Sequence, residues 1–171
     1  NKVLILEDNP KAYYYKAYAK RDLGEYKDAI YYVNKAIELD PRYMRAYHLR
    51  GIIKYYLEDN SGSLEDFKYV LKNDKERKLF ATTYHNIGIL KSDNNEEQEA
   101  IYNFNKAIEI NSKYLNAYNN RGVSFMALGK YEEAIKDFDK VLEIDPEYFN
   151  GYYNRGLSLN NLEKYEEAIK D

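Results

Sequence analysis

A short tyrosine-containing segment recurs five times along this sequence at nearly constant spacing. The small residue that closes each copy is found, in order, at Ala17, Gly51, Gly88, Gly122 and Gly156, so the intervals are 34, 37, 34 and 34 residues. A fixed period of this length is typical of arrays in which one small unit stacks on copies of itself, because a single unit cannot bury its own apolar face. The three extra residues fall in the connection around residues 72–80, where we expect the regular stacking to be disturbed.

Each unit contains two helical patterns. In the fourth copy, apolar residues of the second pattern recur three and four positions apart, which is the spacing of an amphipathic helix: Ala134, Ile135, Phe138, Val141, Leu142 and Ile144. Gly24 and Gly129 stand between the two helices, where a helix end favours positive φ. Pro41 and Pro146 follow the second helices, which proline cannot continue. The second copy has Glu58 in place of the turn glycine, and we expect a less regular turn there.

Numbered within the unit, the repeat has Tyr at the fourth place, Gly or Ala at the eighth, a small residue at the twentieth, Phe or Val at the twenty-fourth and often Pro at the thirty-second. This pattern resembles the tetratricopeptide repeat, and the resemblance covers Pro10 to Asp171. It implies an all-α fold, a right-handed superhelical solenoid of antiparallel helix pairs. The implied repeats are 10–43, 44–80 with the insertion, 81–114, 115–148 and a truncated fifth at 149–171, preceded at 1–9 by the end of an earlier second helix. Because both ends fall inside a repeat, we expect the chain to be a fragment of a longer array.

The composition narrows the classes of function. With 26 Lys and Arg against 29 Asp and Glu, and a formal net charge of -3, the chain has no basic excess for nucleic acid or an anionic membrane. It has no cysteine, which excludes disulfides and thiolate metal sites and is compatible with a reducing compartment, so we interpret the chain as cytoplasmic. No apolar stretch approaches the ~20 residues that cross a bilayer.

Three sets of periodic residues are predicted to hold the helix pairs together. Glycine at the eighth place costs about 1 kcal/mol against alanine in a helix, which is explained if the second helix packs where a side chain would collide. The small residues facing it would be Ala29, Ser63, Ala100, Ala134 and Ala168. The fourth-place tyrosines should pack between helices with their hydroxyls at an edge. Arginine at the seventh place accompanies aspartate at the twenty-third, and we expect an ion pair between the two helices in each case: Arg50–Asp66, Arg121–Asp137 and Arg155–Asp171.

Function is expected in the groove that the first helices of the stacked pairs form together, because stacked repeats create there an extended concave surface that no single repeat forms alone. The strongest candidate is the row of asparagines at the sixth place, Asn86, Asn120 and Asn154. A carboxamide offers a donor and an acceptor together, as the backbone of an extended peptide requires. The resemblance implies the same role, since some tetratricopeptide proteins hold a peptide backbone with asparagines at this place. The alternative is that asparagine is simply abundant in this sequence. The further groove candidates are Asn116, Asn119, Asn150, His48, His85, Lys11, Arg45, Tyr14 and Tyr153.

Other kinds of site fit less well. The carboxylate clamp of some family members needs lysine at the fifth place and asparagine at the ninth, and this sequence has neither. His48 and His85 share the fifth place of adjacent repeats and should face the same groove, yet no further ligand at metal-binding spacing accompanies them. We therefore predict no metal, no cofactor and no catalytic constellation, and hence no enzyme. The first two repeats do place Lys11, Arg21, Arg45 and Lys54 beside tyrosines, so an acidic or aromatic segment could dock at that end.

These observations predict a protein-interaction scaffold that binds a peptide segment of a partner in its concave groove. Two alternatives stay open. The chain could be a self-assembly module that pairs through the uncovered face of its last repeat, which carries Tyr152, Leu157, Leu159, Leu162 and Ile169. It could also be the substrate-recruiting arm of a larger enzyme whose catalytic residues lie elsewhere.

Overall fold

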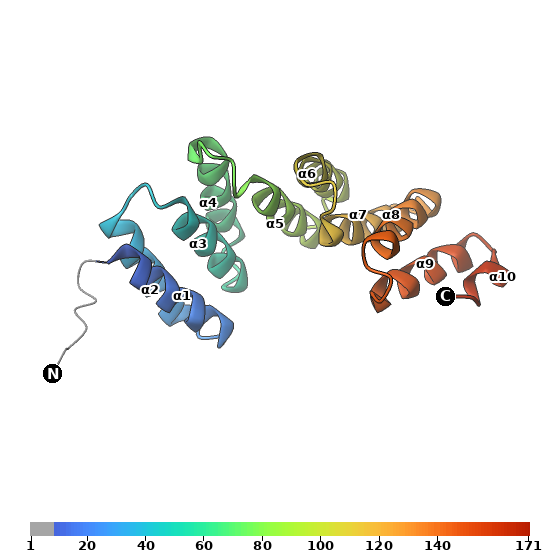
Figure 1. The fold of residues 1–171 in the computed structure, drawn as a ribbon, viewed down its shortest axis with the longest axis horizontal. Helices are drawn as coiled ribbons and strands as arrows, with labels where there is room; N and C mark the ends of the chain where they lie inside the picture. The colour runs from blue at the N-terminus through green and yellow to red at the C-terminus, as the bar shows by residue number, and fades with distance from the viewer. Residues whose placement is uncertain (1–8) are drawn as a thin grey trace. The chain divides into compact units, whose positions relative to one another are not determined.

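The computed structural model describes residues 9–171, and within this range helices joined by turns and short connections form the fold, without strands (Figure 1). The helices are α1 (Pro10–Asp22), α2 (Tyr26–Leu39), α3 (Met44–Tyr56), α4 (Asn60–Asn73), α5 (Phe80–Asp93), α6 (Glu97–Ile110), α7 (Leu115–Ala127), α8 (Tyr131–Ile144), α9 (Phe149–Asn161) and α10 (Tyr165–Ala168). The prediction of an all-α fold is confirmed. The helix end predicted for residues 1–9 falls almost entirely outside the described residues. None of the helices in residues 9–171 has the length and apolar character needed to span a bilayer.

The chain divides into two compact units, residues 1–83 and residues 84–171. In unit 1, α1 packs against α2, α2 against α3, and α3 against α4. In unit 2, α6 packs against α7, α7 against α8, α8 against α9, and α9 against α10. Within each unit these helices pack on neighbours in sequence, which is the stacking of antiparallel helix pairs that the period predicts.

Glycine at the eighth place makes room for an aromatic ring on the second helix. A Cβ on Gly51 would lie 2.7 Å from Cε1 of Phe67, and a Cβ on Gly88 would lie 2.5 Å from Cε1 of Phe104. Both rings are 1% exposed. The predicted collision is therefore confirmed, and the atoms that such a Cβ would meet belong to the phenylalanine at the twenty-fourth place.

The first repeat divides the same space differently. Its eighth place is Ala17 and its twenty-fourth is Val33, both fully buried, so a larger residue on the first helix faces a smaller one on the second. The small twentieth-place residue has a separate use in the second repeat, where the Ser63 hydroxyl donates to the carbonyl oxygen of Gly51 at 2.8 Å.

The three predicted Arg–Asp pairs are present. Nε of Arg50 donates to Oδ2 of Asp66 at 2.9 Å, and its Nη2 donates to Oδ1 at 2.7 Å, which is the two-pronged geometry that guanidinium and carboxylate groups favour. The Asp66 side chain is only 3% exposed, so the pair is shielded from water on the carboxylate side. Later repeats contain the same arrangement in Arg121–Asp137 and Arg155–Asp171.

The same arginines also bind the preceding repeat, which the sequence did not reveal. Nη1 of Arg50 donates to Oδ1 of Asn34 at 3.0 Å. Each partner in this second set of bonds lies on the second helix of the preceding repeat, and the remaining bonds are Arg121 to Asn105 and Arg155 to Asp139. In the first repeat, where the seventh place is lysine, the Lys16 ammonium instead lies 4.2 Å from the ring centroid of Tyr32, in a cation–π contact.

The turn between α3 and α4 is regular, so the prediction of an irregular turn in the second repeat is wrong. Glu58 has φ 62, close to the φ of 75 at Gly24 and 71 at Gly129. The closing bond is also the same, because the backbone N–H of Asp59 donates to the Lys54 carbonyl at 2.9 Å, as that of Glu25 does to the Lys20 carbonyl. Backbone groups alone close this turn, so it forms even where a side chain must accept the left-handed conformation.

The fourth-place tyrosines fix the loops between repeats. The Tyr152 hydroxyl donates to the Pro146 carbonyl at 3.1 Å, and the Tyr47 hydroxyl reaches the Pro41 carbonyl at 3.4 Å. In the second repeat the Tyr47 ring also stacks on that of Tyr69 on α4, with centroids 4.3 Å apart, so the ring packs between helices while its hydroxyl lies at the edge, as predicted.

Candidate functional site

The asparagine row lies in unit 2 on three first helices. Asn86 is on α5, Asn120 on α7 and Asn154 on α9, and all three side chains are partly buried. They occupy the same place in successive repeats, so the helical repeat itself brings them to corresponding positions.

Hydrogen bonds join these helices through a continuous polar chain. Nδ2 of Asn154 donates to Oδ1 of Asn119 at 3.4 Å, and Nδ2 of Asn119 donates to Oδ1 of Asn120 at 3.2 Å. Nδ2 of Asn120 then lies 3.1 Å from Nε2 of His85. We refer to these four residues as the asparagine network. It links the fifth place of one repeat to the sixth place of the next, so it contains the fifth-place residues His85 and Asn119 beside Asn120 and Asn154 of the predicted row, and it does not include Asn86.

The network leaves binding capacity in its carboxamides. Each carboxamide carries two N–H groups and an oxygen with two lone pairs. The bonds within residues 9–171 use one N–H and one lone pair of Asn120, and one N–H of Asn154. A partly exposed carboxamide of this kind can still donate to and accept from a peptide backbone, while its internal bonds hold it in one orientation.

His85 is the buried member of the network and does not face the solvent. Its side chain is only 7% exposed, and its ring centroid lies 4.9 Å from that of Tyr114 and 5.8 Å from that of Phe104. Burial lowers the pKa of His85, which favours the neutral imidazole. A neutral ring can accept the N–H of Asn120 at Nε2, whereas an imidazolium cannot.

His48 has a similar setting in unit 1. Its ring lies 5.7 Å from that of Phe67, and burial, with a smaller contribution from the charge of Arg21, lowers its pKa to about 4. The expectation that His48 and His85 share one groove joins residues of two units and stays a prediction. Among residues 9–171, no group of three or more His, Cys, Asp and Glu side chains could hold a metal ion.

An apolar cavity adjoins the network. Its volume is about 240 Å³, and it is lined by Ile89, Ser92, Asp93, Phe104, Asn120 and Val123. Asn120 is therefore both a member of the network and a wall of the cavity. Ile89 and Val123 are ninth-place residues and were not among the candidates predicted from the sequence. The site thus combines oriented carboxamides with a place for an apolar side chain.

The remaining candidates lie around these features. Asn116 and Asn150, at the second place, are exposed on α7 and α9. Tyr153 is 57% exposed and its ring stacks on that of Phe149 at 6.5 Å. In unit 1, Tyr14 is partly buried against Tyr43, with ring centroids 5.2 Å apart. Lys11 and Arg45 are exposed and belong to a separate cleft of that unit.

Comparison with known families and structures identifies the repeats. Tetratricopeptide repeat models match residues 10–43, 115–148 and 138–170, and a TPR repeat model matches residues 92–129. The chain is 30% identical over 110 residues to TPR repeat-containing protein MJ1428 of Methanocaldococcus jannaschii, covering 64% of this chain and 19% of that protein. It is 29% identical over 122 residues to tetratricopeptide repeat protein 13 of Homo sapiens, covering 68% of this chain and 13% of the relative. The chain therefore spans less than a fifth of the length of either protein.

Solved structures show the same fold. The crystal structure of MamA protein matches with a TM-score of 0.78 and 24% identity, over 94% of this chain and 86% of that one. YrrB, a TPR protein with an unusual peptide-binding site, matches with a TM-score of 0.72 and 22% identity, over 96% of this chain and 84% of its own. At these identities the likeness extends to the fold and not to the site.

Proposed function

The chain belongs to the tetratricopeptide repeat family, and we propose that it is a protein-interaction module that binds an extended segment of a partner protein along the first helices of unit 2. The observation that supports this proposal is the asparagine network beside the apolar cavity. The carboxamides would bind the main chain of the segment, and the cavity would take one of its apolar side chains.

The geometry suits a backbone-directed mode of recognition. Peptide main chain presents alternating donors and acceptors, and a carboxamide can satisfy one of each. Because His85 and Asn119 hold Asn120 on either side, its carboxamide does not need to be ordered when the ligand arrives, which lowers the entropic cost of binding. Side-chain selectivity would then come mainly from the cavity between Ile89 and Val123.

A peptide-array screen followed by fluorescence polarisation tests this proposal. The intact chain is compared with Asn86→Ala/Asn120→Ala/Asn154→Ala and with Gln98→Ala, which removes an exposed carboxamide from a second helix of the same unit. All proteins must first show the same helicity and melting behaviour. Peptides that bind the intact chain and the Gln98→Ala control should bind the triple variant tenfold to roughly a hundredfold more weakly, at about 1 kcal/mol for each lost hydrogen bond. Equal binding by the triple variant would refute the network as the binding element.

Self-association is a second candidate, favoured by the surface of α9 and α10. Phe149 and Ile169 are 75% and 84% exposed, and a cavity of about 350 Å³ lies beside Phe149, Tyr153 and Leu157. The face is smaller than predicted, since Leu159 is only 6% exposed because it packs inside unit 2. A concentration-dependent mass in light scattering, abolished by Phe149→Lys, would support this candidate.

A substrate-recruiting role within a larger enzyme is a third candidate function, and none of the matched family models describes a catalytic domain.

A further inference from the structure

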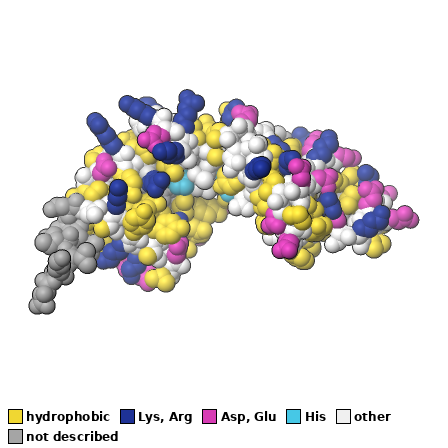
Figure 2. Space-filling view, viewed as in Figure 1, with side chains coloured by type: hydrophobic (Ala, Val, Ile, Leu, Met, Phe, Trp, Pro, Cys, Tyr) yellow, Lys and Arg dark blue, Asp and Glu magenta, His cyan; other side chains and the backbone are white. Residues whose placement is uncertain are grey.

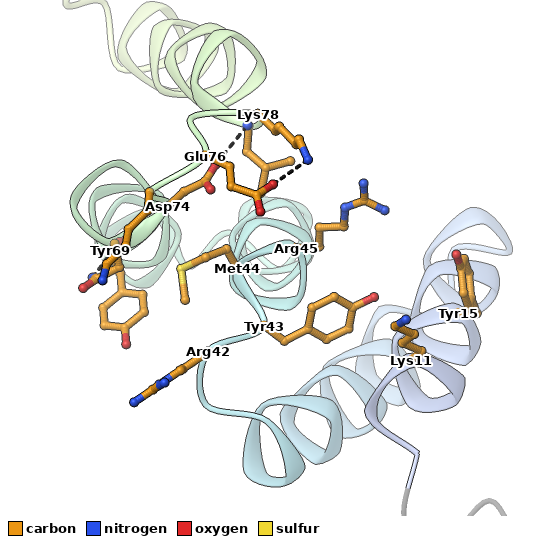
Figure 3. A pocket seen from close by; sticks show the side chains of 13 residues that line it. Lys11, Tyr15, Arg42, Tyr43, Met44, Arg45, Tyr69, Asp74, Glu76 and Lys78 are labelled. Atoms are coloured by element: carbon orange, nitrogen blue, oxygen red, sulfur yellow. Dashed lines mark hydrogen bonds and ion pairs between the residues drawn. The ribbon is translucent and has the colours of Figure 1, made fainter.

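A basic cleft lies in unit 1 around the start of α3 (Figure 3). It has a volume of about 960 Å³ and receives side chains from α1, the α2–α3 connection, α3, the end of α4 and the α4–α5 connection. Five of its lining residues are cations and two are carboxylates, in a chain whose net charge is -3. We refer to this surface, with Lys11, Arg42, Arg45, Lys75 and Lys78 as its cations, as the basic cleft.

Most of these cations have no ionic partner among the residues that the structure describes. Lys78 pairs with Glu76 at 2.5 Å. Within residues 9–171, no carboxylate lies within ion-pair distance of Lys11, Arg42 or Arg45. The arginines at the seventh place behave differently, because each of them is bound to an aspartate. The charges of Lys11, Arg42 and Arg45 are the part of the cleft that we take to be available to a ligand.

The charge is also unusual within the array itself. Lys11 and Arg45 stand at the second place, in the first turn of α1 and α3, where the helix dipole disfavours cations. The later repeats have neutral residues there, namely Thr82, Asn116 and Asn150. A local departure from helix preference is expected where a residue serves a function other than stability.

The three-residue insertion adds to the same surface. Lys75, Glu76 and Lys78 come from the lengthened α4–α5 connection, which forms one wall of the cleft. Figure 2 shows Lys and Arg side chains projecting where the α2–α3 and α4–α5 connections lie. The lengthened connection thus supplies two lysines to the cleft, together with the carboxylates of Asp74 and Glu76.

Aromatic rings stand among the cations. Tyr15 is 62% exposed and Tyr69 is 39% exposed, and the Tyr43 ring points towards Lys11 in Figure 3. Arg45 and Arg42 extend to different sides of the α3 start in the same view, so the charges are set apart rather than gathered on one point. Such spacing suits several carboxylates along a flexible chain better than one compact phosphate.

We propose that the basic cleft binds an acidic segment of a partner protein, in which carboxylates alternate with aromatic or apolar side chains. The carboxylates would pair with Arg42, Arg45 and Lys11, and the apolar side chains would rest on the tyrosine rings. This surface lies in unit 1 and does not include the asparagine network, so it is a second binding surface whose success or failure does not depend on the first.

The test uses a fluorescein-labelled decapeptide in which glutamate alternates with tyrosine, and the same peptide with glutamine for glutamate. The test variant is Arg42→Gln/Arg45→Gln. The control is Lys72→Gln/Lys113→Gln, which removes the same charge from exposed lysines outside the cleft. We expect the glutamate peptide to bind the test variant roughly tenfold more weakly than the control, and binding to weaken as salt is raised. The asparagine triple variant should bind it as the intact chain does.

Several results would overturn the proposal. Equal affinity of test and control variants would show that the cleft is not the binding surface. Equal binding of the glutamine peptide would show that charge is not what is recognised. If inorganic phosphate or a labelled oligouridine bound the cleft more tightly than the glutamate peptide, and Arg42→Gln/Arg45→Gln abolished that binding, the ligand would be a small anion or RNA instead.

Discussion

The ring of Phe138 occupies the position where a side chain on Gly122 would begin, since a Cβ added there would lie 2.7 Å from Cε1 of the ring. Phe138 is fully buried, so it has little room to move. We predict that Gly122→Ala lowers the free energy of unfolding by about 1 kcal/mol, because the strain of overpacking exceeds the gain in helix propensity. Urea denaturation measures this change. Gly156→Ala is the matched control, because its Cβ would stand 3.6 Å from the nearest atom, and it should cost nothing.

The first repeat suggests how the loss can be rescued. Ala17 and Val33 fill there the space that Gly122 and Phe138 fill in the fourth repeat. In a double-mutant cycle, Phe138→Val should cost less in the presence of Gly122→Ala than alone, with a coupling of about 1 kcal/mol or more. Additive effects would show that the two residues do not share one volume.

Removal of Arg121 should expose the cost of a buried carboxylate. The Asp137 side chain is 5% exposed, and burial raises its pKa while the Arg121 guanidinium opposes that rise. We predict that Arg121→Gln lowers the free energy of unfolding by about 3 kcal/mol near pH 7, because an unpaired charge stays buried. Without the arginine the folded-state pKa rises further above the unfolded value, so the loss should shrink as the pH falls through that raised pKa. Denaturation at a series of pH values checks this, with Lys136→Gln as the control; a loss that does not change with pH would contradict it.

Glu58 holds a conformation that glycine adopts without strain. Its φ is 62 and its side chain is exposed. Glu58→Gly should raise the free energy of unfolding by roughly 0.5–1 kcal/mol, since the relief of left-handed strain exceeds the entropy that glycine adds to the unfolded chain. Glu65→Gly, in the middle of α4, should lower it by about 1 kcal/mol. Thermal melts of the two variants should therefore shift in opposite directions.

His48 should make folding sensitive to mild acid. Its folded pKa of about 4 lies below the usual 6.5, so the unfolded state binds the proton more readily. The stability that the neutral ring contributes is complete above pH 6.5 and is lost as the pH falls from 6.5 towards 4. Proton NMR of the two histidine C2–H signals should show that of His48 titrating near pH 4. A midpoint near 6.5 would mean that its ring is hydrated.

The helix pairs, and the Arg–Asp ion pairs within them, could be predicted from the sequence because the residues that form them recur with the repeat. A small residue at the eighth place, and arginine with aspartate sixteen residues later, recur often enough to be recognised without coordinates. The sequence did not show that the ring of Phe67 fills the space over Gly51, because spacing alone does not tell which of two facing residues, Ser63 or Phe67, reaches further. The turn at Glu58 was misjudged because residue type was weighed above the backbone bonds that close it.

The candidate sites depend on packing between repeats, which the sequence shows less clearly. Asn119 and Asn154 are bonded across two helices, 35 residues apart, and only the structure shows that fifth-place and sixth-place residues meet. Burial of His85 also depends on packing between repeats, because its ring contacts Tyr114, which lies directly before the next repeat. The sequence predicted only part of the basic cleft, namely Lys11 and Arg45. Lys75 and Lys78 come from the lengthened α4–α5 connection, which has no counterpart in the regular repeat.

The hydrogen bonds from the seventh-place arginines to the preceding repeat affect how the array unfolds. Arg50, Arg121 and Arg155 each couple one repeat to its predecessor, so those repeats should lose structure together. The repeat at 81–114 has Ile87 at the same place, and an aliphatic side chain has no N–H to donate backwards. We therefore predict that this repeat is coupled less strongly to its predecessor than the repeats that have the arginine. In denaturant the protein should therefore unfold in two transitions rather than in one.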